Sequence, residues 1–303
     1  MIKQFIFTTL IMGTIMNVVG QTIPTKDGQL ALKIYSGQLN ETVILLHGGP
    51  GVPDGLEEVA GMLSSHYRVV TFDQRGTGAS TNIPGDYSVE AYISDIDAIA
   101  DYLGVSDFHL FGHSWGGLYA QIYMDRRAEK VKSLFLCSPS SGTGIHWVET
   151  EKEVMQFNKS KAEGSEWMKM GWYSLKGMMG SDKAYKKLFQ IVMRNYHKGF
   201  DIEEGSPDWL EKIHSDPINK TRKELKHYPL LQTFENAEIP ILITYGEGDI
   251  YGDSKQQVLK RYPHGKMMTI SNSGHIPWKH NPEQFEEIVT RFFDLEDNNS
   301  SGE

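Results

Sequence analysis

The chain has 303 residues, which is enough for one large α/β domain with an insertion or for two small domains. A hydrophobic content of 39% and a charged content of 23% are typical of soluble globular proteins, and they exclude a disordered or fibrous chain. The net charge is −9, and the sequence has no basic stripe and no nucleic-acid-binding module, so we expect no nucleic-acid partner.

The N-terminus has the pattern of a secretory signal peptide. Lys3 provides a positive charge, residues 5–19 are mostly apolar, and small residues precede a possible cleavage site after Gly20. We therefore expect residues 1–20 to be a signal peptide and the mature chain to be secreted or periplasmic, without stable membrane association. The alternative is an uncleaved membrane anchor, although the apolar run is short for a membrane span and Asn17 interrupts it.

Strand and helix patterns alternate over the first half of the chain. Residues 29–35 alternate between apolar and polar, which predicts a half-exposed antiparallel strand. Continuous apolar runs predict strands buried on both faces at residues 43–46, 69–72, 108–111 and 133–137. Helical patterns lie between these runs, with Asp54 and Gly104 as candidate caps, at residues 54–64, 92–103 and 118–124. This alternation predicts a parallel sheet with right-handed crossovers.

The alternation stops after residue 140. Residues 141–235 are polar, helical in pattern and rich in aromatic side chains, which indicates a helical cap inserted between two strands. The sheet pattern then returns, with a strand at 240–245, a helix near 254–262, a strand at 266–271 and an amphipathic helix from Pro282. We therefore assign an α/β domain to residues 21–140 and 236–296, the cap to 141–235, and a disordered tail to 297–303.

The central motif is Gly112-x-Ser114-x-Gly116, between the strand at 108–111 and the helix at 118–124. A tight strand-to-helix turn of this kind, a nucleophile elbow, lifts a serine hydroxyl clear of the sheet. The residues two before and two after the serine come close together, which glycine permits. The helix that follows presents unpaired N–H groups where an oxyanion would form. Because glycine is abundant here, this motif needs partners elsewhere in the chain before it indicates a catalytic site.

Such partners follow the ends of other predicted strands. His47, Asp73, Ser114, Asp249 and His275 all lie just past strand ends, where open α/β sheets bind ligands. Three of them form a Ser–Asp–His set in the chain order of the α/β-hydrolases. We expect Ser114 to be the nucleophile, His275 to take and return its proton, and Asp249 to orient the imidazole and stabilise its charged form.

Other residues of the same types fit less well. Asp253 lies beyond the strand-end turn, so Asp249 is preferred as the acid. His280 lies on the approach to the last helix and is interpreted as a surface residue, which leaves His275 as the base. His113 precedes the nucleophile, and we expect it to be a packed or hydrogen-bonded core residue that points away from the pocket.

Backbone N–H groups are the expected oxyanion donors, because they are fixed and need no reorganisation. Trp115, directly after the nucleophile, would supply one, and Gly49 of the glycine-rich segment 47–51 the other, with Gly48 as the next candidate for this second donor. Gly48 is also expected to contact the substrate. The sequence has no HExxH motif, no Cys/His cluster and no phosphate loop, so we expect no metal and no cofactor. Cys137 is the single cysteine, so no intrachain disulfide can form, and its apolar neighbours predict a core residue.

Taken together, five segments resemble the α/β-hydrolase superfamily and, within it, the proline iminopeptidase group of serine peptidases. They are residues 47–51 (HGGPG), 73–76 (DQRG), 112–116 (GHSWG), 246–249 (GEGD) and 274–275 (GH). The resemblance covers about two-thirds of the chain. It implies an α/β-hydrolase fold with an inserted cap. The elbow differs from the usual pattern of the group, which has glycine where His113 stands.

The resemblance also implies release of an N-terminal residue, often proline, from short peptides. In this group acidic cap residues bind the free amino group of the substrate, because a desolvated amine needs a carboxylate. The candidates are Glu149, Glu151, Glu153, Glu203 and Glu204. We expect Glu203, Glu204 and the cap residue Trp147 to contact the substrate.

The leading functional hypothesis is therefore a serine aminopeptidase of the proline iminopeptidase type, acting through an acyl-enzyme on short peptides or other small molecules. The alternative is a carboxylic ester or thioester hydrolase with the same triad. A third hypothesis is a hydrolase fold that binds a ligand without turnover, and the intact set of Ser114, Asp249 and His275 argues against it.

Overall fold

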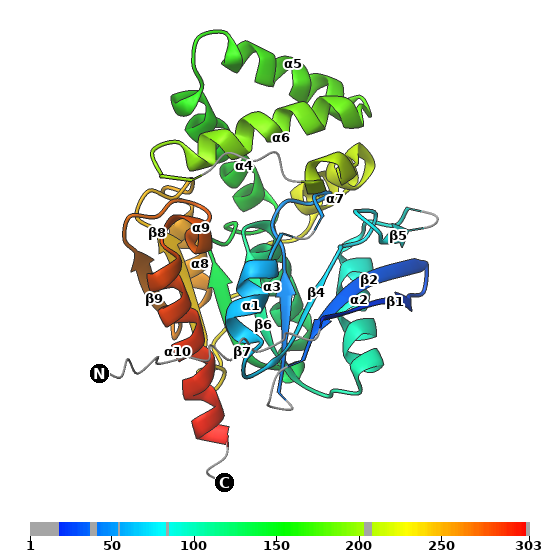
Figure 1. Ribbon diagram of the computed structural model, residues 1–303, viewed down its shortest axis with the longest axis vertical. Coiled ribbons are helices and arrows are strands. Elements are labelled where there is room, and N and C mark those ends of the chain that lie inside the picture. Colours follow the sequence, from blue (N-terminus) through cyan, green and yellow to red (C-terminus); the bar gives the residue numbers. More distant parts are fainter. Residues whose placement is uncertain (1–17, 37–40, 54, 83–84, 203–207, 301–303) are drawn as a thin grey trace, which may run out of the picture.

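The computed structural model describes residues 18–36, 41–53, 55–82, 85–202 and 208–300, and it has one sheet covered by helices on both faces (Figure 1). The strands of the described residues are β1 (Val18–Pro24), β2 (Gly28–Tyr35), β3 (Thr42–Leu46), β4 (Arg68–Phe72), β5 (Thr81–Asn82), β6 (Phe108–His113), β7 (Val131–Cys137), β8 (Ile241–Gly246) and β9 (Lys266–Ile270). Their order is β1-β2-β4-β3-β6-β7-β8-β9, with β5 paired to β2. The strands from β4 to β9 along this order are parallel, and β1 and β2 are antiparallel to their neighbours.

The central strands are buried on both faces, as their continuous apolar sequences predict. Every residue of β3, β6 and β8 is buried. Side chains alternate across the sheet: Ile44 and Leu46 pack on one face with α2 (Val89–Leu103), α3 (Trp115–Arg127) and α8 (Lys255–Arg261). Val43 and Leu45 pack on the opposite face with α1 (Glu57–Leu63) and α10 (Pro282–Ser300).

Helix ends follow local capping chemistry where the sequence supplies it. The Ser88 hydroxyl accepts the Ala91 N–H and starts α2, and Gly104 ends it in the left-handed conformation with φ of 66°. Helix α1 begins only at Glu57, and the candidate cap Asp54 lies outside the described residues. The short helix α9 (Pro277–His280) was not expected from the sequence.

Between β7 and β8 the chain forms α4 (Ile145–Lys161), α5 (Glu166–Met178), α6 (Asp182–His197) and α7 (Ser215–His227), with a 3₁₀ turn at 208–212. These helices lie within residues 141–235, where the sequence indicates an inserted cap, and they sit above one end of the sheet (Figure 1). Helix α7 is tied to the body of the protein, because the Tyr92 and Thr221 hydroxyls are 2.7 Å apart.

The two ends of the chain differ in how far the structure describes them. Residues 1–17 of the predicted signal peptide lie outside the described residues, and β1 passes through the predicted cleavage site after Gly20, so processing stays a prediction. Helix α10 is described as far as Ser300, and residues 301–303 lie outside the described residues, so the disordered tail expected from residue 297 stays a prediction. No helix among the described residues is long and apolar enough to span a bilayer.

Candidate active site

Ser114 occupies the sharp turn between β6 and α3. Its backbone is strained, with φ of 56° and ψ of −117°, and the Ser114 N–H is held by the carbonyl of Cys137 on β7. A Cβ at Gly112 would overlap the carbonyl oxygen of Gly116, and a Cβ at Gly116 would overlap that of Leu46. The turn therefore requires glycine at both positions. For Gly112 the reason is the expected approach to Gly116, and for Gly116 it is the approach to the end of β3.

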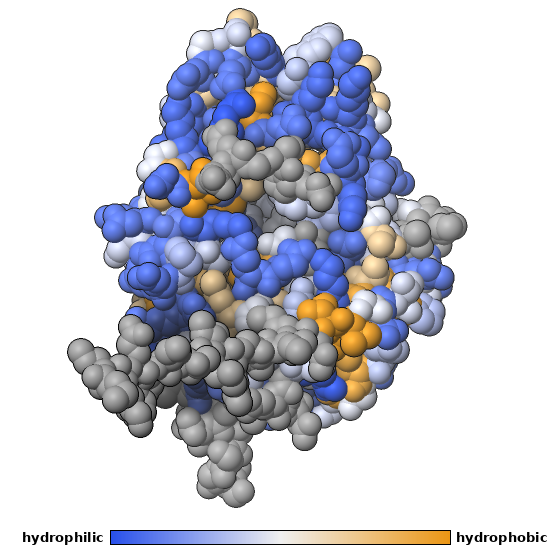
Figure 2. All heavy atoms as spheres, viewed as in Figure 1, coloured by the Kyte–Doolittle hydropathy of each residue, from blue (hydrophilic) through white to orange (hydrophobic). Residues whose placement is uncertain are grey.

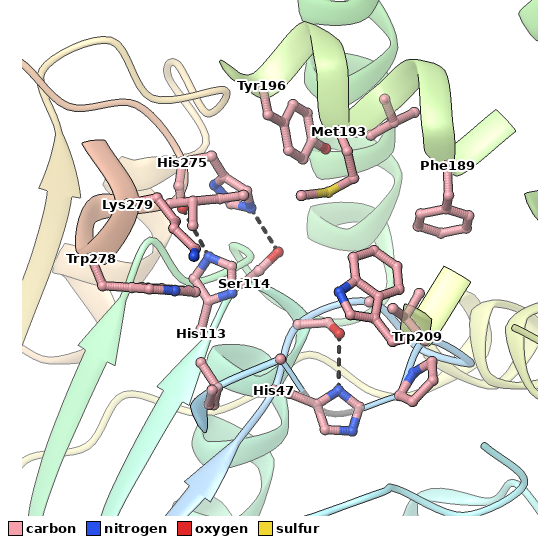
Figure 3. A pocket seen from close by; sticks show the side chains of 18 of the residues that line it. His47, His113, Ser114, Phe189, Met193, Tyr196, Trp209, His275, Trp278 and Lys279 are labelled. Atoms are coloured by element: carbon pink, nitrogen blue, oxygen red, sulfur yellow. Dashed lines mark hydrogen bonds between the residues drawn. The ribbon is translucent and has the colours of Figure 1, made fainter. Parts of the chain in front are cut away.

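The structure brings the three predicted side chains together at the carboxyl ends of β6, β8 and β9, and Figure 3 shows Ser114 and His275 facing each other. The His275 Nε2 lies 2.9 Å from the Ser114 Oγ, and the His275 Nδ1 lies 3.2 Å from the Asp249 Oδ1. A carboxylate can only accept, so Nδ1 carries the proton and Nε2 is free to accept from the Ser114 hydroxyl. This is the arrangement that a serine nucleophile and its general base require.

Asp249 is held as a carboxylate. The Ser138 hydroxyl donates to its Oδ2 at 2.6 Å, and the Tyr251 N–H donates to its Oδ1 at 3.2 Å. Burial raises the pKa of Asp249. The electrostatic interaction with His275 and the hydrogen bonds from His275 and Ser138 lower it by more, so the pKa lies below its usual value. Ser138 directly follows β7, the neighbour of β8 in the sheet.

Tyr251 is a site residue that sequence reasoning missed. Its hydroxyl lies 3.3 Å from the Ser114 Oγ and 2.8 Å from the Ser140 Oγ, and its ring meets the His275 imidazole edge-on at 5.2 Å. Burial raises the pKa of the Tyr251 hydroxyl above its usual value, so it is a neutral donor. When Ser114 donates to His275, its oxygen can accept from Tyr251. The available signal was the position of Tyr251, two residues after Asp249 in the same strand-end turn.

His113 is buried and hydrogen-bonded, but the expectation that it points away from the pocket is wrong. It lines the cavity in front of Ser114, and its Nε2 donates to the carbonyl oxygen of His275 at 2.8 Å (Figure 3). The reason is Gly48, where a Cβ would come within 2.9 Å of the His113 Nδ1, so the missing side chain leaves room for the ring. Burial and the neighbouring His275 lower the pKa of His113 to about 3, so it is neutral.

Gln74 connects the two segments that are expected to supply the oxyanion donors. Its side-chain amide donates to the carbonyl of His47 at 2.9 Å and accepts from the Trp115 indole at 2.7 Å, while its N–H donates to the His47 ring at 3.2 Å. These bonds fix the glycine-rich segment 47–51 against the elbow. Gly49 lines the cavity with φ of 70°, and Trp115 is the first residue of α3; their role as donors remains a prediction.

Arg75, which follows Gln74 in the segment 73–76, has a structural role. The Arg75 guanidinium is buried and bonds both carboxylate oxygens of Asp95 on α2, at 2.8 and 2.7 Å. It also reaches Asp27 at 3.0 Å. Residues 73–76 therefore form a scaffold behind the site, with Gln74 tied to the elbow and Arg75 tied to α2.

The cavity in front of Ser114 has a volume of about 320 Å³ and is lined mainly by apolar side chains. Helix α6 and the 208–212 turn contribute Phe189, Met193, Tyr196 and Trp209 to the lining. In Figure 3 Tyr196 and Met193 lie on the His275 side of the cavity, and Trp209 lies on the His47 side. The body of the protein contributes Val52, Leu56, Ile276 and Trp278. At the mouth, Glu57 pairs with Lys33 at 2.6 Å and Glu58 pairs with Lys279.

The cap residues that were considered for substrate binding lie in different places. Trp147 is buried away from the cavity lining, where its ring packs edge-on against Trp115 at 6.5 Å. Glu203 and Glu204 lie outside the described residues. Glu153 accepts the N–H groups of Gly252 and Ser254 and so ties α4 to the loop after β8.

Of the other cap candidates, Glu151 lies 3.5 Å from Arg222, and Glu149 is exposed. The rejected acid Asp253 is exposed. His280 is half-buried and not a surface residue, because its Nδ1 accepts the Gly274 N–H at 3.0 Å and its Nε2 lies 3.0 Å from His197. Among the described residues, no group of three or more His, Cys, Asp or Glu side chains could hold a metal ion.

Comparison with known proteins agrees with this fold. A family model described as the alpha/beta hydrolase fold matches residues 41–184. The proline iminopeptidase of Lactobacillus crispatus is 25% identical over 302 residues, which cover 93% of this chain and 100% of that protein. The chain has the α/β-hydrolase fold and resembles the proline iminopeptidases.

Solved structures share this fold. The proline iminopeptidase of Mycobacterium smegmatis has a TM-score of 0.67 at 17% identity, with 93% of this chain and 100% of that chain covered. The naproxen esterase (carboxylesterase NP) of Bacillus subtilis has a TM-score of 0.61 at 19% identity, with 92% of each chain covered. At these identities the likeness concerns the fold, which a peptidase and an esterase share.

Proposed function

We propose that this α/β-hydrolase is a serine aminopeptidase that releases an N-terminal residue, above all proline, from short peptides. The observation that carries the proposal is the hydrogen-bonded set of Ser114, His275 and Asp249 at the floor of a small apolar cavity. The resemblance to a proline iminopeptidase over 93% of this chain supports the choice of substrate.

The reaction follows from the hydrogen bonds. The Ser114 Oγ attacks the carbonyl carbon of the N-terminal residue while the His275 Nε2 takes its proton, and Asp249 stabilises the imidazolium. The N–H groups of Trp115 and Gly49 would bind the oxyanion. His275 then returns the proton to the leaving amine, which leaves the acyl group on Ser114. Water attacks this ester with His275 again as the base, and the free amino acid departs.

The cavity suits a small cyclic residue. Its volume of about 320 Å³ lies at the lower end of the usual range for small-molecule sites, roughly 300–1,000 Å³. Phe189, Tyr196 and Trp209 offer aromatic surface to an apolar ring. Glu203 and Glu204 remain our candidates for the substrate's ammonium group, and they lie in the segment between α6 and Trp209.

A carboxylic ester or thioester hydrolase is the second candidate. The observation that favours it is that Glu57 and Glu58, at the cavity mouth, each pair with a lysine and so are not free to bind an ammonium group. An uncharged acyl substrate would need no such partner.

One substrate panel separates the two candidates. We expect hydrolysis of a prolyl arylamide with a kcat/KM well above that of its N-acetylated form, because acetylation removes the charge that a carboxylate would bind. Glu203→Gln and Glu204→Gln should raise KM for the free arylamide, with the exposed Glu149→Gln as the matched control. Turnover of a short-chain aryl ester with no turnover of either amide would reject the peptidase and favour the second candidate.

A further inference from the structure

The outer face of α5 carries a stripe of exposed apolar side chains. Its members are Met168 (71% exposed), Trp172 (56%), Leu175 (48%) and Met179 (80%). Their spacing of i, i+4, i+7 and i+11 places them within about 60° of the helix circumference, at roughly 100° per residue. Met178, at 58% exposure, lies beside the stripe. Single exposed apolar residues are ordinary, but three aligned on α5 and a fourth at its C-cap, Met179, indicate a contact surface.

The opposite side of α5 already has its packing partners. Met170 and Gly177 are buried there, and a Cβ at Gly177 would overlap the Tyr185 ring on α6. The Glu166 carboxylate at the start of α5 pairs with Arg194 of α6. Helix α5 is therefore fixed in orientation by its inner face, and the stripe remains turned outward.

The surroundings of the stripe are basic in an acidic protein. Residues 166–187 contain five lysines and two acidic residues, a net charge of +3, whereas the whole chain has −9. Both acids are engaged, Glu166 with Arg194 and Asp182 with the Ser215 hydroxyl and N–H. Hydrophilic residues dominate the end of the molecule formed by α5 and α6 in the view of Figure 2.

The lysines are arranged along the stripe. Lys169 and Lys176 are exposed, lie seven residues apart and so follow the same flank of α5. The Lys176 Nζ lies 4.7 Å from the centre of the Trp172 ring. Apolar side chains with an indole between them and lysines along the edge are the pattern of helices that lie in the interface of an anionic bilayer. Lysine stems can extend to the phosphate layer while the apolar residues enter below it.

We propose that the outer face of α5 is a docking surface for a bilayer that contains anionic phospholipid. The association is peripheral and reversible, and it depends on the stripe for apolar contact and on the flanking lysines for charge. The surface lies at the end of the molecule opposite the C-terminal end of α10 (Figure 1). The neighbouring α6 lines the substrate cavity with Phe189 and Met193, so docking would bring the cavity close to the bilayer surface. The inference does not depend on which acyl compound is hydrolysed.

The test places a reporter on the stripe of the full chain. Cys137 is buried, so Met168→Cys provides a single reactive position for an environment-sensitive nitrobenzoxadiazole dye. The control is Tyr102→Cys on α2, an exposed aromatic residue (49%) on a different helix. The vesicles are phosphatidylcholine alone, or equal parts of phosphatidylcholine and phosphatidylglycerol.

We expect the dye at Met168→Cys to shift to the blue with the anionic vesicles only, and the shift to disappear in high salt, because screening removes the attraction of the lysines. The dye at Tyr102→Cys should not respond. In vesicle sedimentation, Trp172→Ser with Leu175→Ser should lower the partition coefficient about tenfold or more. Unchanged hydrolysis of a soluble substrate would show that this variant is folded.

Three results would overturn the proposal. The first is no spectral change at residue 168 with anionic vesicles. The second is an equal spectral change with phosphatidylcholine alone, which would show that binding does not depend on the charge of the lysines. The third is a change that depends on protein concentration without vesicles, which would assign the stripe to a second copy of this chain.

Discussion

Asp249→Asn tests the electrostatic part of the site while keeping its volume. In the native protein the carboxylate faces the His275 Nδ1 at 3.2 Å and would stabilise the imidazolium that forms in the transition state. At an effective dielectric constant of about 20, removing one charge at this distance costs roughly 5 kcal/mol. That corresponds to a loss of about 10⁴-fold in kcat, because each 1.36 kcal/mol is tenfold. KM should change little, since this interaction is made only in the transition state.

The assay is the kcat and KM of the purified variant on the best substrate of the panel, with circular dichroism to show that it is folded. Asp253→Asn is the matched control, because Asp253 is an exposed acid four residues further along the same loop. It should retain native kcat. A loss of kcat of less than about tenfold for Asp249→Asn would refute the electrostatic argument. A large loss of kcat for Asp253→Asn would show that the assignment of Asp249 as the triad acid is wrong.

Three further predictions concern residues around the triad. Tyr251→Phe removes the hydroxyl 3.3 Å from the nucleophile, and kcat should fall several-fold, for about 1 kcal/mol, with KM unchanged. The pKa of His113 is lowered to about 3, so between pH 6.5 and pH 3 the unfolded chain binds more protons and stability falls as the pH falls. Between pH 6.5 and pH 5 the unfolding free energy of the native protein should therefore fall by about 2 kcal/mol more than that of His113→Gln, as measured by urea denaturation. Arg75→Met leaves Asp95 buried without its partner, and the unfolding free energy should fall by about 3–5 kcal/mol.

An exposed arginine serves as the control for Arg75→Met. Arg126→Met, which breaks an exposed pair with Glu90, should cost less than about 1 kcal/mol. An unaltered kcat in Tyr251→Phe would show that the Tyr251 hydroxyl has no role in the reaction. A native pH slope in His113→Gln, or a stability loss in Arg75→Met no larger than in Arg126→Met, would contradict the corresponding prediction.

The sheet was predictable because burial on both faces leaves a plain signal. Strands such as β3 and β6 are continuous apolar runs, since helices cover the sheet on both sides. The meeting of Ser114, Asp249 and His275 was predictable for a related reason: each follows a strand of one parallel sheet, and the carboxyl ends of such strands share one edge.

Side-chain directions in the turns were not predictable in the same way. The contact of Tyr251 with Ser114 and the bond from Ser138 to Asp249 depend on loop conformations that no periodic pattern fixes. The orientation of His113 depends on the space at Gly48, which lies far away in the sequence. The start of α1 was misplaced because Asp54 resembles a cap, whereas the helix begins at Glu57.

The cap was the hardest part to interpret from the sequence. Its aromatic residues have no strand-end rule to place them, so Trp147 was expected in the pocket although it packs against Trp115 in the core. Trp209, which does line the cavity, was not singled out. Which cap residues contact the substrate depends on how these helices pack, which is a property of the tertiary structure and not of a local sequence pattern.

The central claim is that Ser114 is the nucleophile, and covalent labelling tests it most directly. The native protein is treated with a fluorophosphonate, and its intact mass and peptide map are measured. The account predicts one adduct per chain, located on Ser114, with loss of activity in proportion to labelling and no adduct on Ser114→Ala. An adduct on a different residue, or hydrolysis that survives in Ser114→Ala, would contradict it.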